Sequence, residues 1–252
     1  MSDWPDGAAD LVQAVADTKL LLSHRFAQWS LAGPSLEDDI GGASAAQEEI
    51  GHARQLFRLL EGQGRDGDWL RGDREPAEFA NASCLDHVGD DWVAFLAAVG
   101  PADRAAWYLL DAVDHDDFRG LVEKMGEDEY FHLEYHDARL ETLAEERPDA
   151  VGAALAEALP GALALLGPAG REDPLYHDAE FLDRDVNGLR GSFADHYRSL
   201  LDGTDVPTGA VDWDAPAADD WDPVRRRAGG GGISSSDADM LAGRANREFL
   251  VE

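Results

Sequence analysis

The sequence is poor in positive charge and in cysteine. Only two of its 252 residues are lysines, Lys19 and Lys124, and Cys84 is the single cysteine. One cysteine excludes an intramolecular disulfide framework. The 21 lysines and arginines are outnumbered by 52 aspartates and glutamates, which gives a formal net charge of −31. Because such a chain repels phosphate groups, we expect neither nucleic acid nor an anionic membrane as its partner.

Targeting and membrane signals are also missing. No signal peptide and no uninterrupted apolar run of about 18 residues is visible, so we expect a cytoplasmic protein. The acidic residues are spread along the chain, and the hydrophobic content of 44% argues against disorder. A carboxylate excess of this size is self-repelling unless salt screens it, which indicates a protein of a halophilic organism.

Long alternating strand patterns are absent, whereas apolar residues recur at helical spacing. Helices are predicted over residues 8–31, 36–61, 91–113 and about 117–146, with Gly100-Pro101 kinking or breaking the third. The prediction is an all-α fold: a ferritin-like four-helix bundle core over residues 1–147. Residues 148–252 are expected to add C-terminal helices and a Gly/Pro-rich extension packed on the bundle.

The predicted additions are less regular than the core. Residues 62–90 should form a long loop, and helices are expected over 148–166, bent or interrupted at Pro160, and over 185–201. After an irregular stretch at 202–233, Ser236-x-x-Asp239 resembles a capping box for a final helix at 237–250.

Two Glu-x-x-His pairs lie on helix faces that are otherwise apolar. Glu129 and His132 share a stripe with Phe118, Val122, Met125, His136, Leu140 and Leu143. Glu49 and His52 share one with Ala45, Leu56 and Leu59. A buried carboxylate requires a partner, and paired Glu-x-x-His helices form half of a carboxylate-bridged di-metal bundle.

The other two helices of such a bundle should each supply one carboxylate. Asp103 lies on the apolar face of the third helix. Helix one has an apolar side of Leu11, Val15, Leu22, Phe26 and Trp29 and a more polar stripe containing Asp17, His24 and Gln28. The stripe places Gln28 at the position where a ligand would be expected, and Gln28 brings no negative charge.

Two interpretations of these residues remain open. Carboxylate and imidazole ligands suit iron or manganese. Alternatively, the acidic groups are buried ion-pair networks, for instance with Arg54, Arg104 or Arg139. Arg225-Arg226-Arg227, the only concentrated positive charge, is either a site for a phosphate-bearing ligand or an acidic partner, or a solvated loop.

The chain resembles the phenylacetate-catabolic family of ferritin-like proteins, the subunits of the multicomponent phenylacetyl-CoA epoxidase. The resemblance is carried by LLLSHRFAQW, GPSLEDDIGGASAAQEEIGHARQLFRLL, ADRAAWYLLDA, EDEYFHLEYHDARLETL and GGGGISSSDADMLAGRANREFL. It implies a complex in which dioxygen, activated at di-iron, is inserted as an epoxide into the ring of an aromatic acyl-CoA. The length, the short loop at 30–34 and the Gly-rich segment resemble the structural (C) subunit, which pairs with the catalytic subunit.

Two hypotheses therefore stand. The first is a structural subunit of the epoxidase that is not catalytic alone; the second is a metal-bearing di-iron oxygenase or oxidase in its own right. The resemblance places Glu49, His52, Asp103, Glu129 and His132 where the catalytic subunit has metal ligands. Because Gln28 leaves helix one without a carboxylate, we expect weak or substoichiometric iron.

Overall fold

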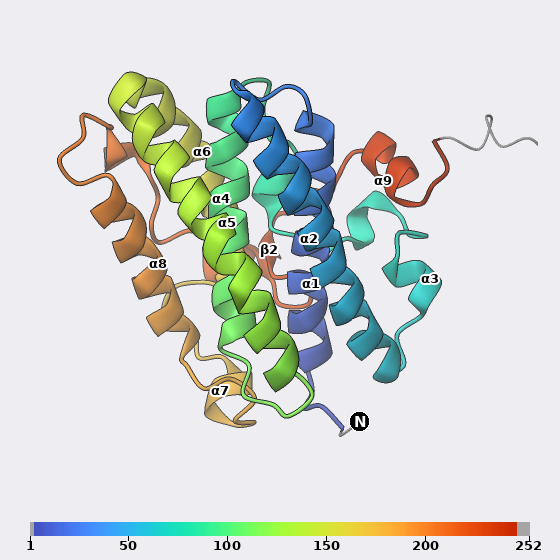
Figure 1. The fold of residues 1–252 in the computed structure, drawn as a ribbon. Coiled ribbons are helices and arrows are strands. Elements are labelled where there is room, and N and C mark those ends of the chain that lie inside the picture. The colour runs from blue at the N-terminus through green and yellow to red at the C-terminus, as the bar shows by residue number, and fades with distance from the viewer. Residues whose placement is uncertain (1–2, 246–252) are drawn as a thin grey trace, which may run out of the picture.

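The computed structural model describes residues 3–245, and helices form most of it (Figure 1). Four long helices build the core: α1 (Ala8–Trp29), α2 (Leu36–Gly62), α4 (Trp92–Asp111) and α5 (Arg119–Glu146). α1 packs against α2 and α4, and α5 packs against α4 and α2, so the four close into a bundle. The predicted all-α, ferritin-like fold is confirmed.

Local chemistry explains where the core helices begin. The Ser35 side chain caps α2 by accepting from the Asp38 N–H, and Asp91 caps α4 by accepting from the Ala94 N–H. α4 runs without a break through Pro101. Of the predicted kink or break at Gly100-Pro101, the break is therefore wrong, and the kink stays a prediction. The next helix, α6 (Pro148–Leu166), likewise continues through Pro160. It was predicted to be bent or interrupted there, and the interruption does not occur.

The connection between α2 and α4 is a long loop, as predicted, with short helical turns. It contains α3 (Gly67–Leu70) and 3-10 turns at Pro76–Glu78 and Ser83–Leu85. This loop packs on α1, since Asp17 of α1 accepts from the Ala80 N–H and forms a buried ion pair with Arg74.

The C-terminal part packs beside the bundle. α6 lies against α4, and α8 (Val186–Leu200) lies against both (Figure 1). The short helix α7 (Pro174–His177) precedes α8. Residues 202–233 hold 3-10 turns at Thr208–Ala210 and Ala218–Asp220, and a small antiparallel pair of strands, β1 (Trp221–Asp222) and β2 (Arg227–Ala228). The division of the chain at residue 147 stays a prediction.

The arginine cluster is neither a solvated loop nor an exposed anion site. Arg226 donates to the main-chain carbonyls of Leu165 and Leu166 and pairs with Asp173. Arg227 pairs with Asp86, and Arg225 donates to the Phe79 and Gly231 carbonyls. The sequence interpretation failed here because a run of arginines does not reveal main-chain acceptors brought from distant segments.

The last described helix, α9 (Ser235–Leu241), starts earlier than predicted. Its cap is Ser234, whose Oγ accepts from the Asp237 N–H, rather than Ser236. Earlier capping turns Asp237 toward α1, where Arg25 and His24 bind its carboxylate. The helix ends at Leu241, and residues 246–250 of the predicted helix lie outside the described residues.

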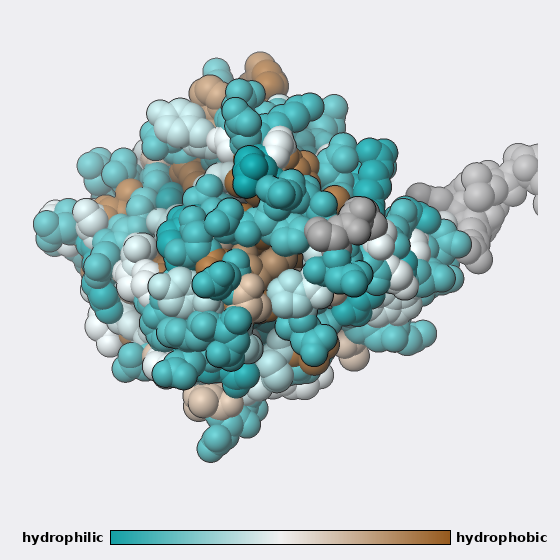
Figure 2. All heavy atoms as spheres, turned by 90° about the horizontal axis from the view of Figure 1, so that it is seen from below, coloured by the Kyte–Doolittle hydropathy of each residue, from teal (hydrophilic) through white to brown (hydrophobic). Residues whose placement is uncertain are grey.

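Among the described residues, only α6 has the length and apolar composition that could cross a membrane. No uninterrupted apolar run of about 18 residues was visible in the sequence, and α6 contains Asp149 and Glu157. Just over half of this stretch, 56%, is buried inside the protein, where Leu155, Leu159 and Leu163 join the core. Buried core helices commonly meet the same criterion. From the end of the bundle where α7 lies, hydrophilic residues cover most of the surface (Figure 2).

Candidate metal centre

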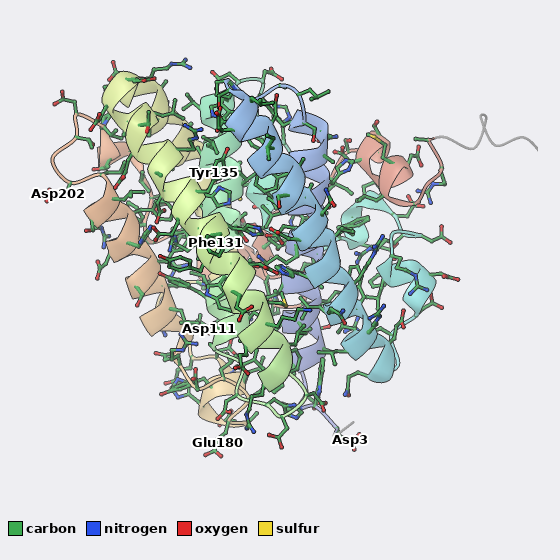
Figure 3. The ribbon with its side chains drawn as sticks, viewed as in Figure 1. Asp3, Asp111, Phe131, Tyr135, Glu180 and Asp202 are labelled. Atoms are coloured by element: carbon green, nitrogen blue, oxygen red, sulfur yellow. The ribbon has the colours of Figure 1, made fainter. Side chains whose placement is uncertain are left out.

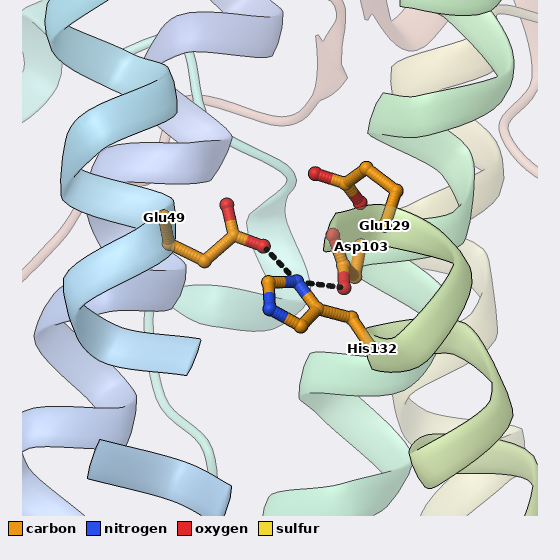
Figure 4. Close-up of side chains that lie close together, drawn as sticks. All are labelled: Glu49, Asp103, Glu129 and His132. Atoms are coloured by element: carbon orange, nitrogen blue, oxygen red, sulfur yellow. Dashed lines mark hydrogen bonds and ion pairs between the residues drawn. The ribbon is translucent and has the colours of Figure 1, made fainter. Parts of the chain in front are cut away.

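The polar residues expected at the metal site lie together in the bundle interior. Glu49 of α2, Asp103 of α4, and Glu129 and His132 of α5 each offer a ligand atom, and these atoms all lie within 4.8 Å of one another (Figure 4). The three carboxylates are fully buried. Helical periodicity brings them there, because each shares a face with the apolar residues that drive its helix into the core.

Two histidines flank the carboxylates with their rings turned inward. His132 Nδ1 lies 3.2 Å from Glu49 Oε1 and 3.9 Å from Asp103 Oδ2. His52 Nδ1 lies 3.0 Å from Glu129 Oε1 and 3.8 Å from Glu49 Oε2. The structure thus places all five residues named from the sequence around one point.

A residue that the sequence interpretation missed occupies the centre of this cluster. The Lys19 ammonium, carried by α1, lies 3.1 Å from Glu49 Oε1 and 2.5 Å from both Asp103 Oδ1 and Glu129 Oε1. Its side chain is fully buried. An ammonium group has three N–H donors, so one lysine can satisfy one carboxylate from each of the other three bundle helices.

The signal for Lys19 was present in the sequence. The apolar side of helix one runs through Leu11, Val15, Leu22 and Phe26, and the turn between Val15 and Leu22 is filled by Lys19. Lysine is almost never fully buried unless it is paired, and Lys19 was given no role in the site from the sequence. Three carboxylates on the facing helices were the hint that a buried cation was required.

The helix-one position assigned to Gln28 is wrong. Gln28 lies about 13 Å further along the helix axis, at 1.5 Å of rise per residue. Its side chain accepts from Arg25 and donates to Asp237 of α9. His24 also contacts Asp237, and Asp17 is held by Arg74. The polar stripe of helix one therefore faces the loop and α9, while its apolar side faces the bundle centre.

The electrostatics of the cluster follow from this central ammonium. Burial opposes the charge of Lys19, but attraction by Asp103, Glu129 and Glu49 outweighs burial and raises the pKa of the lysine. Burial likewise opposes the ionised carboxylates, yet attraction by Lys19 lowers the pKa of Glu49 and holds that of Asp103 well below its ordinary range. The ammonium therefore keeps two deeply buried carboxylates ionised.

The two histidines add further positive charge. Burial disfavours their charged forms, but their carboxylate partners raise the pKa of His52 to about 9 and that of His132 to about 10. The pKa of Glu129 is raised, first by burial and then by repulsion from Asp103. Lys19 and the two protonated rings thus bring three positive charges to the cluster, so the chain itself supplies counter-charge for its buried carboxylates.

The alternative interpretation expected a buried ion-pair network, and the structure contains one, but the three arginines suggested as its cations are not part of it. Arg104 pairs with Asp137, Arg139 pairs with Asp38, and Arg54 is exposed. His136 also belongs to the centre, since its Nε2 lies 3.2 Å from Asp103 Oδ2 while its ring stacks on Phe26. Lys19 is the cation that the network uses.

The carboxylate and imidazole groups of the cluster fit iron or manganese, but the Lys19 ammonium at its centre does not. Carboxylates and imidazoles are the ligands of such metals, and Glu49 Oε2 and Glu129 Oε2 are buried without a hydrogen bond. Against this, the Lys19 ammonium lies at the shared point of all three carboxylates. A di-metal site needs a carboxylate from helix one, and this helix supplies a cation instead.

Comparison with known proteins agrees with the fold and the motifs. A search of curated proteins found no match. The family model described as "Phenylacetic acid catabolic protein" matches residues 5–220, which include every bundle helix and all the residues of the central cluster. The chain belongs to this phenylacetic acid catabolic protein family.

Proposed function

We propose that this protein is the structural subunit of a multicomponent phenylacetyl-CoA epoxidase, acting in the cytoplasm of a halophilic organism. It would pair with a catalytic di-iron subunit that has the same fold and would not carry out the oxygenation itself. Membership of the phenylacetic acid catabolic family supports the pathway and a multi-subunit complex. An aromatic acyl-CoA would bind the complex through the catalytic subunit.

The observation that carries the non-catalytic role is the position of Lys19. Its ammonium takes the oxygen atoms that a pair of metal ions would require from Glu49, Asp103 and Glu129. The buried carboxylates thus have a cation from the chain itself, and the bundle needs none from solution to neutralise them. A scaffold that keeps the oxygenase fold but fills its centre with an ion pair suits a subunit that supports a catalytic partner.

The proposed contact surface is the outer face of α2 and α5. Leu36, Ile40, Tyr130 and Phe131 on these helices are between 61% and 70% exposed, and Phe131 lies on the outer side of α5 close to Tyr135 (Figure 3). A pocket of about 330 Å³ opens there between the two helices. Exposed aromatic and aliphatic residues on one face are typical of the centre of an obligate interface.

Co-purification tests the pairing. The chain would be produced with a ferritin-like oxygenase subunit encoded beside it, and light scattering would give the mass of the complex. Phe131→Glu should abolish the complex, because a charge would be buried in the interface. Val224→Glu is the matched control, since Val224 is an exposed apolar residue on the distant β1–β2 turn, 54% exposed. A complex that survives Phe131→Glu would refute this surface, and a chain that never pairs would refute the proposed function.

A second function, a metal-bearing oxygenase or oxidase in its own right, is favoured by one observation. Glu49 and Glu129 each keep one buried oxygen without a hydrogen bond, beside two inward-facing imidazoles. Elemental analysis of the isolated chain decides between the two. Two tightly held irons per chain with turnover of an aromatic acyl-CoA would establish the oxygenase, whereas the structural role predicts little or no iron and no epoxidation.

A further inference from the structure

We infer that Lys19 closes a latent divalent-cation site, and that removing its charge converts the cluster of Glu49, Asp103, Glu129, His52 and His132 into a centre that binds one such cation. The inference concerns the same residues as the proposed function. It rests on that function to explain why the centre is closed in the wild-type chain. It concerns the isolated chain, so its failure can be told apart from a failure of the pairing.

The first support is the spacing of the donor atoms. The ligand atoms of Glu49, Asp103, Glu129 and His132 lie within 4.8 Å of one another. Two ligands on opposite sides of one metal, each about 2.1 Å from it, are about 4.2 Å apart. A contraction of about half an ångström would bring these atoms to bonding distance. The ammonium of Lys19, at 2.5 to 3.1 Å from the three carboxylates, holds them just outside it.

Unsatisfied atoms give the second support. Glu49 Oε2 and Glu129 Oε2 are buried and make no hydrogen bond with any described residue. A buried carboxylate oxygen without a hydrogen bond is costly, and the cationic group paired with Glu49 Oε2, His52 Nδ1, lies 3.8 Å away, beyond hydrogen-bond distance. The three N–H groups of Lys19 are already directed at one oxygen of each carboxylate, so the lysine cannot satisfy these two atoms as well. A cation with more coordination positions could.

The third support lies outside the carboxylate cluster. His132 Nε2 is 2.7 Å from Glu48 Oε2, and His52 Nε2 is 3.2 Å from Asp128 Oδ2. Each outer carboxylate fixes its ring so that Nδ1 points to the centre. Metal-binding histidines are oriented in this way, with the second ring nitrogen donating to a carboxylate. The rings are thus already set in the orientation that ligation through Nδ1 requires.

Lys19 excludes a cation from this centre for two reasons. Its positive charge repels another cation at the same point, and it occupies one oxygen of each carboxylate. The side chain cannot swing away to solvent, because Lys19 is fully buried and its neighbours on α1, Leu20, Leu21 and Leu22, are core residues. The wild-type site is closed by the sequence of α1 rather than by a movable segment.

Lys19→Met tests the inference, since methionine fills nearly the same space without a charge. Matched to it is Lys124→Met, which changes the other lysine of the chain, exposed on α5. Co²⁺ would be added to each isolated protein in molar NaCl, which screens binding to surface carboxylates. Visible absorption and metal analysis after gel filtration would report bound Co²⁺.

The expected result is about one Co²⁺ per Lys19→Met chain, with a ligand-field absorption band, and no such band in the wild type or in Lys124→Met. Adding Glu48→Gln to Lys19→Met should weaken the affinity about 10- to 100-fold, because His132 would lose the carboxylate that orients it. A folded Lys19→Met protein that binds no more Co²⁺ than the wild type would overturn the inference. So would a wild type that binds Co²⁺ equally well.

Lys19→Met could fail to fold without a cation. Its recovery on refolding with Co²⁺, but not with Na⁺ alone, would support the inference. The variant Lys19→Gln also removes the charge, keeps all five ligands, and carries an amide NH2 group that can donate to the buried carboxylates. If this variant folds and gives no Co²⁺ band, the inference is wrong.

Discussion

Removing the Lys19 charge in the absence of any metal should cost a large part of the folding free energy. Truncating one partner of a buried ion pair costs about 3–5 kcal/mol, and Lys19 has three buried carboxylate partners. Total stabilities are about 5–15 kcal/mol. At about 2–4 °C per kcal/mol for a chain of this size, a loss of about 4 kcal/mol lowers the melting temperature by about 8–16 °C.

The pH dependence of that loss has a defined sign. In the wild type, Lys19 depresses the pKa of Asp103 and Glu49, so their contribution is present above the unfolded pKa of about 4 and is lost as the pH falls through the depressed values. Without Lys19, burial raises the carboxylate pKa values, and that contribution is present at low pH and lost as the pH rises. The deficit of Lys19→Met should therefore grow from about pH 4 to about pH 8.

Urea unfolding with EDTA present, followed by circular dichroism at several pH values, measures this deficit. Lys124→Met serves as the control and should stay within about 0.5 kcal/mol of the wild type, as exposed substitutions do. Lys19→Met/Asp103→Asn should recover part of the loss, because one uncompensated charge is gone. A Lys19→Met deficit below about 1 kcal/mol, the size typical of a surface pair, or one that does not change with pH, would refute the assignment of Lys19 as the internal counter-ion.

Three further predictions concern other parts of the chain. With a net charge of −31, the wild-type melting temperature should rise by more than about 10 °C between low and molar salt; a flat response in calorimetry would contradict the halophilic interpretation. Asp237→Asn should weaken the docking of α9 on α1 by about 1.5–3 kcal/mol, the size of charged hydrogen bonds. Burial opposes the charge of Asp237, but Arg25 and His24 depress its pKa, so the wild-type contact should weaken as the pH falls below about 4. Hydrogen exchange at Ser235–Leu241 would follow both. Cys84 is only partly buried, but loss of solvation raises the pKa of its thiol to about 12. Iodoacetamide at pH 8 should therefore alkylate the folded chain much more slowly than the urea-unfolded chain, and equal labelling rates would contradict the raised pKa.

The four-helix bundle could be predicted from the sequence because the patterns that indicate each helix lie within that helix. Apolar spacing located the four core helices to within a few residues. The same spacing placed Glu49, Asp103 and Glu129 on inward faces. Every one of these inferences depends on residues of a single helix, where periodicity is sufficient.

What could not be read are the partners that come from elsewhere in the chain. Gln28 was assigned to the centre because it is polar and shares a helix with the apolar stripe, whereas its actual partner, Asp237, lies 209 residues later. Lys19 was given no role in the site, since a buried lysine is rare unless paired. Its three partners belong to three other helices, and no property of α1 alone reveals them.

The arginines of the C-terminal segment have a consequence for how the protein responds to salt. Arg190 donates to four main-chain carbonyls, those of Leu163, Gly167, Trp213 and Ala215, and Arg226 donates to two more. A carbonyl oxygen carries no net charge, and both guanidinium groups are buried. Dissolved ions screen attraction between exposed charges but reach buried groups far less. The segment after α6 is thus held by contacts whose strength hardly varies with ionic strength, whereas the interactions among the exposed charges of the protein change with it.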